Sequence, residues 1–288
     1  MNSVSVIIPT AATRDRAGSL GRALDSALSQ DGVRPDVIVV ANGPSCDPDI
    51  LAALARRRDI RLIRRHEAGL GASISTGRDH VNAPFFAELD DDDLLLPGAL
   101  ARRIERMRAE PTVDAVVTSG FLRAGGRETL NLPEIARFAA DPLRALMDSM
   151  WLPPCAGLFR TATIPGEYFR AMPPYLEWTY LAMVLALERR IAFVQAPTFV
   201  YNEDTPGSLS KSREYVLHQP EAIKRLLRLP VPPDVRRRLR QKYVAALHGA
   251  SVTGLSLGHT SLAWRLHLRT VLYPRGWRYL SYTRHLFA

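Results

Sequence analysis

The chain has 288 residues, and 47% of them are of hydrophobic type, which is enough to bury a sizeable core in one or two domains. The formal net charge is +9, and no apolar run approaches the ~18 to 20 residues of a membrane span. No zinc-type histidine spacing, Gly-x-Ser-x-Gly elbow or P-loop occurs, so those enzyme classes are not indicated.

Short β-branched runs alternate with helical periodicity through the first 120 residues. Ser19 is a predicted N-cap, and Asp47 with Pro48 predicts a second helix start. The predicted strands are residues 4–10, 37–40, 60–63, 85–89 and 115–118, and further helices are predicted near 72–81 and 97–107. This βαβ spacing predicts an α/β fold with a Rossmann-like, mostly parallel sheet and helices on both faces.

A run of four acids, Asp90 to Asp93, follows the predicted strand 85–89 directly. Adjacent carboxylates repel one another, so a fold that sets them at a strand end is expected to supply a cation, Mg²⁺ or Mn²⁺. Such an ion completes its shell with water and phosphate oxygens, which indicates a phosphorylated or nucleotide substrate. The alternative is a solvated acidic turn ahead of a helix that has Pro97 in its first turn.

Three polar segments end predicted strands: Thr10 to Arg16, Asn42 to Ser45, and Asp90 to Asp93. In open parallel sheets, ligands bind beyond the carboxyl ends of the strands. We therefore expect these segments to converge on one cleft.

Four motifs together resemble family 2 glycosyltransferases of the GT-A fold, over roughly residues 3 to 210. They are Val6-Ile7-Ile8-Pro9-Thr10, the segment 39–45, the Gly-rich segment 69–77, and Leu89 with the four acids. The resemblance implies an inverting, metal-dependent transfer of sugar from a nucleotide-diphosphate sugar to a hydroxyl acceptor. It also implies a role in bacterial surface or lipid-linked glycan synthesis, with a UDP-sugar as the favoured donor and a glycan or lipid-linked acceptor.

The resemblance also assigns residues to the donor. Asp90 is expected on the ribose side and Asp92 on the metal, with Asp93 in support. Asn42 stands where the family often has an aspartate, so base recognition is expected to differ from the uridine-type pattern. Arg14 and Arg16 are candidates for the diphosphate, although loop arginines are commonly just solvated. The expected nucleotide-sugar-binding residues are Pro9, Thr10, Arg14, Asn42, Gly71, Asp90 and Asp91.

A later acid is the expected general base. Sugar transfer requires a group that takes the proton of the incoming hydroxyl, and a carboxylate suits this role. Aligning Trp178 with the family aromatic places Glu177 where the basic aspartate stands and Leu176 where the preceding glutamate stands. The alternative for Glu177 is an ordinary acid at a helix start, stabilised by the helix dipole.

The segment 201–210 resembles the end of the family's catalytic domain, where a histidine before Pro-Gly-Ser often reaches the metal or diphosphate. Thr205 occupies that place here, and Asp204 is a candidate oxygen ligand for the metal. A turn or capping role is the alternative for Asp204.

The basic charge is concentrated at the end of the chain. Residues 211–288 contain 15 Lys or Arg residues and three acids, a net of +12, which leaves −3 for residues 1–210. We predict a catalytic domain over 1–210 and a helical basic region over 211–288. Basic helices with interleaved aromatics suit an anionic membrane surface. The alternative is a region that packs on the catalytic domain with solvated arginines. Nucleic acid is not an expected partner, because no recognised binding module is present.

Two further expectations concern location and function class. Cys46 and Cys155 lie far apart without metal-ligand spacing, which is typical of a reducing compartment. We therefore expect a cytoplasmic protein, peripheral on the inner face of the membrane if the basic region binds lipid. A non-catalytic relative that binds nucleotide sugars or membrane surfaces is the alternative to an enzyme.

Overall fold

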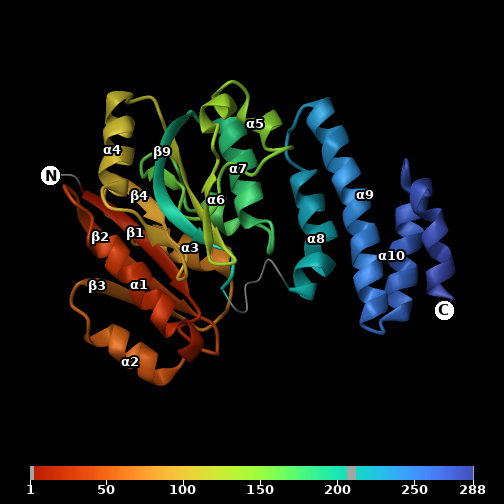
Figure 1. Ribbon diagram of the computed structural model, residues 1–288, viewed down its shortest axis with the longest axis horizontal. Coiled ribbons are helices and arrows are strands. Elements are labelled where there is room, and N and C mark those ends of the chain that lie inside the picture. Colours follow the sequence, from red (N-terminus) through yellow and green to blue (C-terminus); the bar gives the residue numbers. More distant parts are fainter. Residues whose placement is uncertain (1–2, 206–211, 288) are drawn as a thin grey trace. The chain divides into compact units, whose positions relative to one another are not determined.

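The computed structural model describes residues 3–205 and 212–287 (Figure 1). The chain forms two compact units, Met1–Met172 with Glu177–Thr205, and Pro173–Leu176 with Pro206–Ala288. The sequence-based boundary at residue 210 falls within 206–211, outside the described residues. The Pro-Gly-Ser part of the segment 201–210 lies there too.

The first unit contains a nine-stranded sheet in the order β3-β2-β1-β4-β8-β6-β9-β5, and β7 pairs with β6. The strands are β1 (Ser3–Thr10), β2 (Arg34–Asn42), β3 (Ile60–Arg65), β4 (Phe85–Glu88), β5 (Leu94–Leu95), β6 (Ala115–Ala124), β7 (Arg127–Asn131), β8 (Gly157–Arg160) and β9 (Ile191–Asn202). β3, β2, β1 and β4 are parallel, which confirms the predicted α/β sheet. β8 pairs antiparallel with both β4 and β6. The sequence pattern did not predict β8.

Helices follow the strands of this sheet. They are η1 (Arg14–Arg16), α1 (Ala17–Leu28), α2 (Pro48–Arg56), α3 (Leu70–Asp79), α4 (Ala99–Ala109), η2 (Ile135–Ala139), α5 (Pro142–Ala145), α6 (Glu167–Arg170) and α7 (Glu177–Glu188). Asp47 caps α2 as predicted, because its side chain accepts from the backbone N–H groups of Asp49 and Ile50. Ser19 is not a cap: α1 begins earlier, after Arg16, and the Ser19 hydroxyl donates to the Arg16 carbonyl.

The core of the first unit lies along β1 and β2. Val6, Ile7 and Ile8 of β1 are fully buried, as are Ile38 and Val39 of β2. Strands buried on both faces read as continuous β-branched runs rather than as alternating patterns, which is why these segments were recognisable in the sequence. The buried parallel strands hold the loops at their carboxyl ends in fixed positions.

The second unit is helical, with α8 (Arg213–Leu226), α9 (Pro233–Ser256), α10 (Thr260–Leu272) and the 3₁₀ segment η4 (Gly276–Leu286). Its core contains Ile223, Tyr243, Ala246, Leu247, Ala250 and Leu266. The segment Pro173–Leu176 joins this unit through Tyr175, whose ring packs against Tyr215 and His218. Within residues 3–205 and 212–287, no helix combines the length and apolar character needed to cross a bilayer.

Candidate functional site

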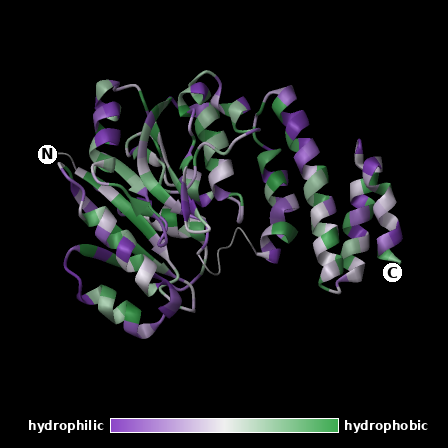
Figure 2. Ribbon diagram, in the orientation of Figure 1, coloured by the Kyte–Doolittle hydropathy of each residue, from purple (hydrophilic) through white to green (hydrophobic). Residues whose placement is uncertain are grey.

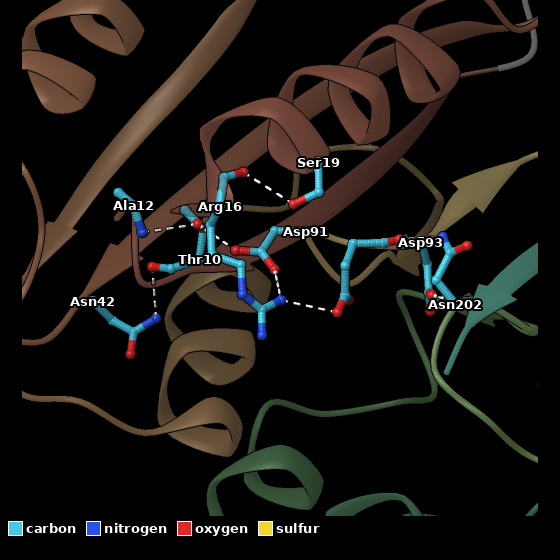
Figure 3. Close-up of polar contacts among 9 residues, drawn as sticks. Thr10, Ala12, Arg16, Ser19, Asn42, Asp91, Asp93 and Asn202 are labelled. Atoms are coloured by element: carbon cyan, nitrogen blue, oxygen red, sulfur yellow. Dashed lines mark hydrogen bonds and ion pairs between the residues drawn. The ribbon is translucent and has the colours of Figure 1, made fainter. Parts of the chain in front are cut away.

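The site is built where β1 ends beside the acidic run that follows β4. The Thr10 hydroxyl donates to Asp91 Oδ2 over 2.6 Å and accepts from the Ala12 backbone N–H over 2.9 Å (Figure 3). Asp91 is only 7% exposed, so it is not part of a solvated turn. The parallel pairing of β1 with β4 brings together two segments that lie 81 residues apart. Two of the three segments that were predicted to converge thus lie side by side, and the third joins them through Asn42, whose amide donates to the Thr10 carbonyl.

Arg16 supplies a positive charge to the acidic run. Its Nη1 lies 2.9 Å from Asp91 Oδ1 and 2.9 Å from Asp92 Oδ2, and its side chain is 18% exposed (Figure 3). Arg14, by contrast, pairs with Asp47 and Asp49, and its side chain is 76% exposed. The chain therefore offsets part of the acidic charge with Arg16, whereas Arg14 lies in a surface ion pair.

Asn42, at the end of β2, ties three segments together. Its amide nitrogen donates to the Thr10 carbonyl over 3.0 Å, and its amide oxygen accepts from the Gly69 backbone N–H over 3.2 Å. Gly69 has φ 148°, a conformation that favours glycine. Gly71 sits in the first turn of α3 so close to α6 that an added Cβ would lie 2.8 Å from the Phe169 carbonyl oxygen. Asn42 thus fixes the loop that precedes α3.

Asp93 is fully buried and connects the acidic run to later strands. It accepts from the Asn202 backbone N–H over 2.8 Å and from the Cys155 thiol over 3.3 Å. The Asn202 side chain donates to the Asp92 carbonyl. The end of β9 and the turn before β8 therefore hold the acids in place.

Three of the acids fit a divalent cation. One carboxylate oxygen from each of Asp90, Asp92 and Asp93 lies within 4.8 Å of the others. Carboxylate oxygens are the donors that Mg²⁺ and Mn²⁺ prefer. The residues present therefore fit a hard divalent ion, in agreement with the sequence-based expectation of a metal at this run.

The pKa shifts of the acids also support a cation at this run. Burial, and then the charge of Asp92, raises the pKa of Asp90 to about 7. Burial, and then the charge of Asp90, raises the pKa of both Glu88 and Asp93 well above their usual range. These carboxylates are hard to ionise together because their negative charges repel one another. A bound divalent cation would offset that repulsion.

Two non-glycine residues at this site have left-handed backbone conformations. Ala12 has φ 47° and Cys155 has φ 62°. Cys155 donates directly to Asp93 of the acidic run, and Ala12 is linked to the run through the Thr10 hydroxyl, which donates to Asp91. Such conformations cost about 1 to 3 kcal/mol each and concentrate at functional sites.

The remaining expected residues lie as follows. Pro9 is in β1 and pairs with Val40 of β2. Glu177 is the first residue of α7. The Asp204 carboxylate accepts from the Gly125 backbone N–H, and among the described residues Asp204 is outside the three-carboxylate group.

Sequence reasoning missed three residues that complete the site: Glu88, Cys155 and Asn202. Glu88 could have been found, because it is an acid inside an otherwise apolar strand and is only 1% exposed. Cys155 and Asn202 gave no such signal, since they lie 62 and 109 residues from Asp93.

Comparison with known sequences places this arrangement among glycosyltransferases. Residues 5–162 match the family described as "Glycosyl transferase family 2". The chain is 32% identical over 142 residues to "Succinoglycan biosynthesis protein ExoO" of Rhizobium meliloti (strain 1021), covering 48% of this chain and 40% of the relative. It is 24% identical over 169 residues to "Uncharacterized glycosyltransferase RC0461" of Rickettsia conorii, and that match covers 58% of this chain and 27% of the relative. The chain thus spans less than half of the length of either relative.

Solved structures share the fold. The chain matches Staphylococcus aureus TarS in complex with UDP-GlcNAc at a TM-score of 0.62 and 14% identity, covering 95% of this chain and 82% of that one. It matches the mannosyltransferase PcManGT of Pyrobaculum calidifontis, in complex with GDP-Man and Mn²⁺, at a TM-score of 0.57 and 18% identity. That match covers 99% of this chain and 84% of the other. At these identities the likeness establishes the fold.

Proposed function

The chain belongs to glycosyl transferase family 2, and we propose that it transfers a sugar from a nucleotide-diphosphate sugar to a hydroxyl acceptor with the help of Mg²⁺ or Mn²⁺. The observation that carries this proposal is the group of three carboxylates, Asp90, Asp92 and Asp93, placed beyond the carboxyl ends of β1 and β4. Ligands of open α/β sheets bind at this edge.

Asp92 is the proposed metal ligand, with oxygens of Asp90 and Asp93 within reach of the same ion. When bound, the metal offsets the negative charge of the donor's diphosphate. Asp90 also faces the ribose side in this proposal. Asp204 stays a proposed oxygen ligand, because it follows shortly after the end of β9 at Asn202.

Thr10, Asn42 and Asp91 are proposed to shape the donor pocket. The Asn42 side chain is held by Thr10 and Gly69, so it fixes the loops at the ends of β1 and β2. Asp91 is held by Thr10 and Arg16. Pro9, Arg14 and Gly71 complete the proposed donor-binding set. A UDP-sugar is the favoured donor.

Metal-dependent donor binding is the first test. Calorimetry with Mn²⁺ and a panel of UDP-, GDP-, dTDP- and CMP-sugars identifies the nucleotide. Asp92→Asn should weaken metal-dependent donor binding by at least tenfold, because it removes one charged ligand. Asp31→Asn, which changes an exposed acid before β2, is the matched control and should leave binding unchanged. Unchanged affinity and metal dependence in Asp92→Asn would remove the acidic run from the site.

Glu177 is the proposed general base. The start of α7 places its carboxylate at the positive end of a helix dipole, which favours the ionised form that a base requires. Glu177→Gln should keep donor binding and lower transfer by roughly 10² to 10⁴. Glu188→Gln, at the other end of α7, is the control. If Glu177→Gln transferred sugar at the wild-type rate, Glu203 and Asp204 would be the next acids to test.

We propose inversion at the anomeric carbon, because one base and an in-line displacement need no covalent enzyme intermediate. The anomeric configuration of the product, read by NMR, tests this, and a retained configuration would contradict it. The proposed acceptor is a bacterial surface glycan or a lipid-linked glycan. A non-catalytic nucleotide-sugar-binding relative is the alternative, motivated by Leu176 and Thr205 in place of the family's acid and histidine. Donor hydrolysis or transfer would rule it out.

A further inference from the structure

Exposed apolar side chains gather in the helical second unit. Seven large hydrophobic side chains among the described residues are strongly exposed, and six of them lie in residues 252–287. The most exposed are Leu272 at 84%, Phe287 at 79% and Trp277 at 73%. Figure 2 shows hydrophobic and hydrophilic residues interleaved along α10 and the final helical segment. A concentration of exposed hydrophobic side chains in one part of a protein indicates a binding surface.

The later part of the second unit also carries a one-sided charge. Residues 235–288 contain ten Lys or Arg residues and no Asp or Glu. Arg265, Leu268, Arg269 and Leu272 are all exposed, at the i, i+3, i+4, i+7 spacing of one helix face on α10. In η4 the exposed residues include Trp277, Arg278, Leu280 and Arg284. The exposed residues of α10 and η4 therefore include both cationic and apolar side chains.

A hollow of about 510 Å³ lies between α9 and the connection from α10 to η4. Its lining residues are Arg237, Arg240, Gln241, Tyr273, Pro274 and Arg275. Within the described part of the chain, none of these three guanidinium groups has a hydrogen bond or an ion pair. Guanidinium groups without a carboxylate partner are suited to bind phosphate oxygens in a bidentate manner.

We propose that the second unit docks on an anionic phospholipid bilayer. The arginine hollow receives a lipid phosphate headgroup, and Leu272, Trp277 and Leu280 enter the interfacial region. The arginine hollow and the exposed apolar side chains are adjacent in the chain, because the lining residues Tyr273 to Arg275 lie between Leu272 and Trp277. Apolar insertion and electrostatic attraction together make such binding stable.

A bilayer suits this surface better than other occupants. A second copy of the chain would bring arginines against arginines, with no acid in residues 235–288 to pair with them. A nucleic acid would account for the arginines and leave the exposed leucines in water. An anionic bilayer accounts for both kinds of side chain.

Co-sedimentation of the full chain with vesicles at low salt tests the proposal. Binding is expected to vesicles of equal parts phosphatidylglycerol and phosphatidylcholine, and not to phosphatidylcholine alone. Changing Arg237, Arg240 and Arg275 together to Gln should weaken binding roughly 100-fold, since each basic residue near an anionic leaflet contributes about fivefold. The charge-matched control changes Arg34, Arg56 and Arg58 of the first unit, all exposed, to Gln and should stay within about threefold of wild type.

Insertion has its own readout. Lipids with brominated acyl chains should quench tryptophan fluorescence in wild type, and Trp277→Phe should remove most of that quenching. Leu272→Ser combined with Leu280→Ser should weaken binding at least tenfold, and circular dichroism melting shows whether each variant is folded. These side chains are exposed, so the melting curves should match wild type.

Three outcomes would overturn the proposal: no vesicle binding by wild type at low salt, equal binding to neutral vesicles, or equal losses in the two arginine triples. Self-association abolished by Trp277→Phe, without vesicle binding, would assign the surface to a second copy instead. Donor binding by calorimetry is a separate measurement, so the membrane proposal and the proposed transfer reaction can fail independently.

Discussion

At the scale of single residues, two arginines two positions apart in the chain have different surroundings. Arg16 bridges Asp91 and Asp92 in a half-buried site, while Arg14 pairs with Asp47 and Asp49 at the surface. The charges of Asp91 and Asp92 raise the pKa of Arg16 even though its burial acts in the opposite direction. The local sequence around the two arginines does not distinguish these roles.

Arg16→Gln should destabilise the metal-free protein by roughly 3 kcal/mol, the lower end of the cost of leaving buried charges without their partner. Arg14→Gln should cost less than about 1 kcal/mol, because exposed ion pairs contribute little. Urea unfolding in the presence of a chelator measures both. Equal losses would show that Arg16 does not offset the acidic run.

The acids also predict a pH dependence. The folded protein holds a proton on Asp90 up to pH about 7, whereas an unfolded aspartate releases it near pH 4. The folded state therefore binds more protons across this window, so its stability falls as the pH rises through it. Glu88 and Asp93 act with the same sign.

In chelator, the melting temperature should be several degrees higher at pH 5 than at pH 8, and Mn²⁺ should reduce the difference because it favours the ionised acids. Asp90→Asn should flatten the profile. A melting temperature that rises from pH 5 to pH 8 in chelator would contradict this account of the cluster.

At the scale of elements, α3 depends on a glycine to approach the sheet. A Cβ at Gly77 would lie 2.4 Å from Cγ2 of Ile7 in β1, which is closer than real contacts allow. Gly21 in α1 has no neighbouring atom within 4 Å of an added Cβ. The close approach of α3 to β1 thus has a steric cause that can be tested.

Gly77→Ala should destabilise the protein by about 1 to 3 kcal/mol through overpacking. Gly21→Ala should stabilise it by about 0.4 to 1 kcal/mol, since alanine reduces the entropy of the unfolded chain. Urea unfolding compares the two helices directly. A stabilising Gly77→Ala would mean that α3 can move away from the sheet without cost.

At the scale of the whole molecule, each unit has its own core. Leu247 is 1% exposed and belongs to the core of the second unit. Leu247→Ala should destabilise that unit by about 2 to 5 kcal/mol. Hydrogen exchange measured by mass spectrometry should rise across residues 212–287 and stay unchanged in β1, β2 and β4. Faster exchange in those strands would show that the two units unfold together.

The sequence alone determined the parallel strands, the capped start of α2, the acidic run at a strand end and the basic, acid-free end of the chain. These features are local, because each depends on the period of a short run or on neighbouring residue types. The family resemblance could be recognised in the sequence for the same reason, because its motifs are short local segments at the ends of strands.

Only the tertiary structure decided which side chains surround the acids. Asn202 and Cys155 reach Asp93 because β9 and the turn before β8 return to this edge of the sheet. Arg16 meets Asp91 because β1 and β4 are neighbours in the sheet. Strand order sets these long-range contacts, and a single sequence carries no periodic signal for strand order.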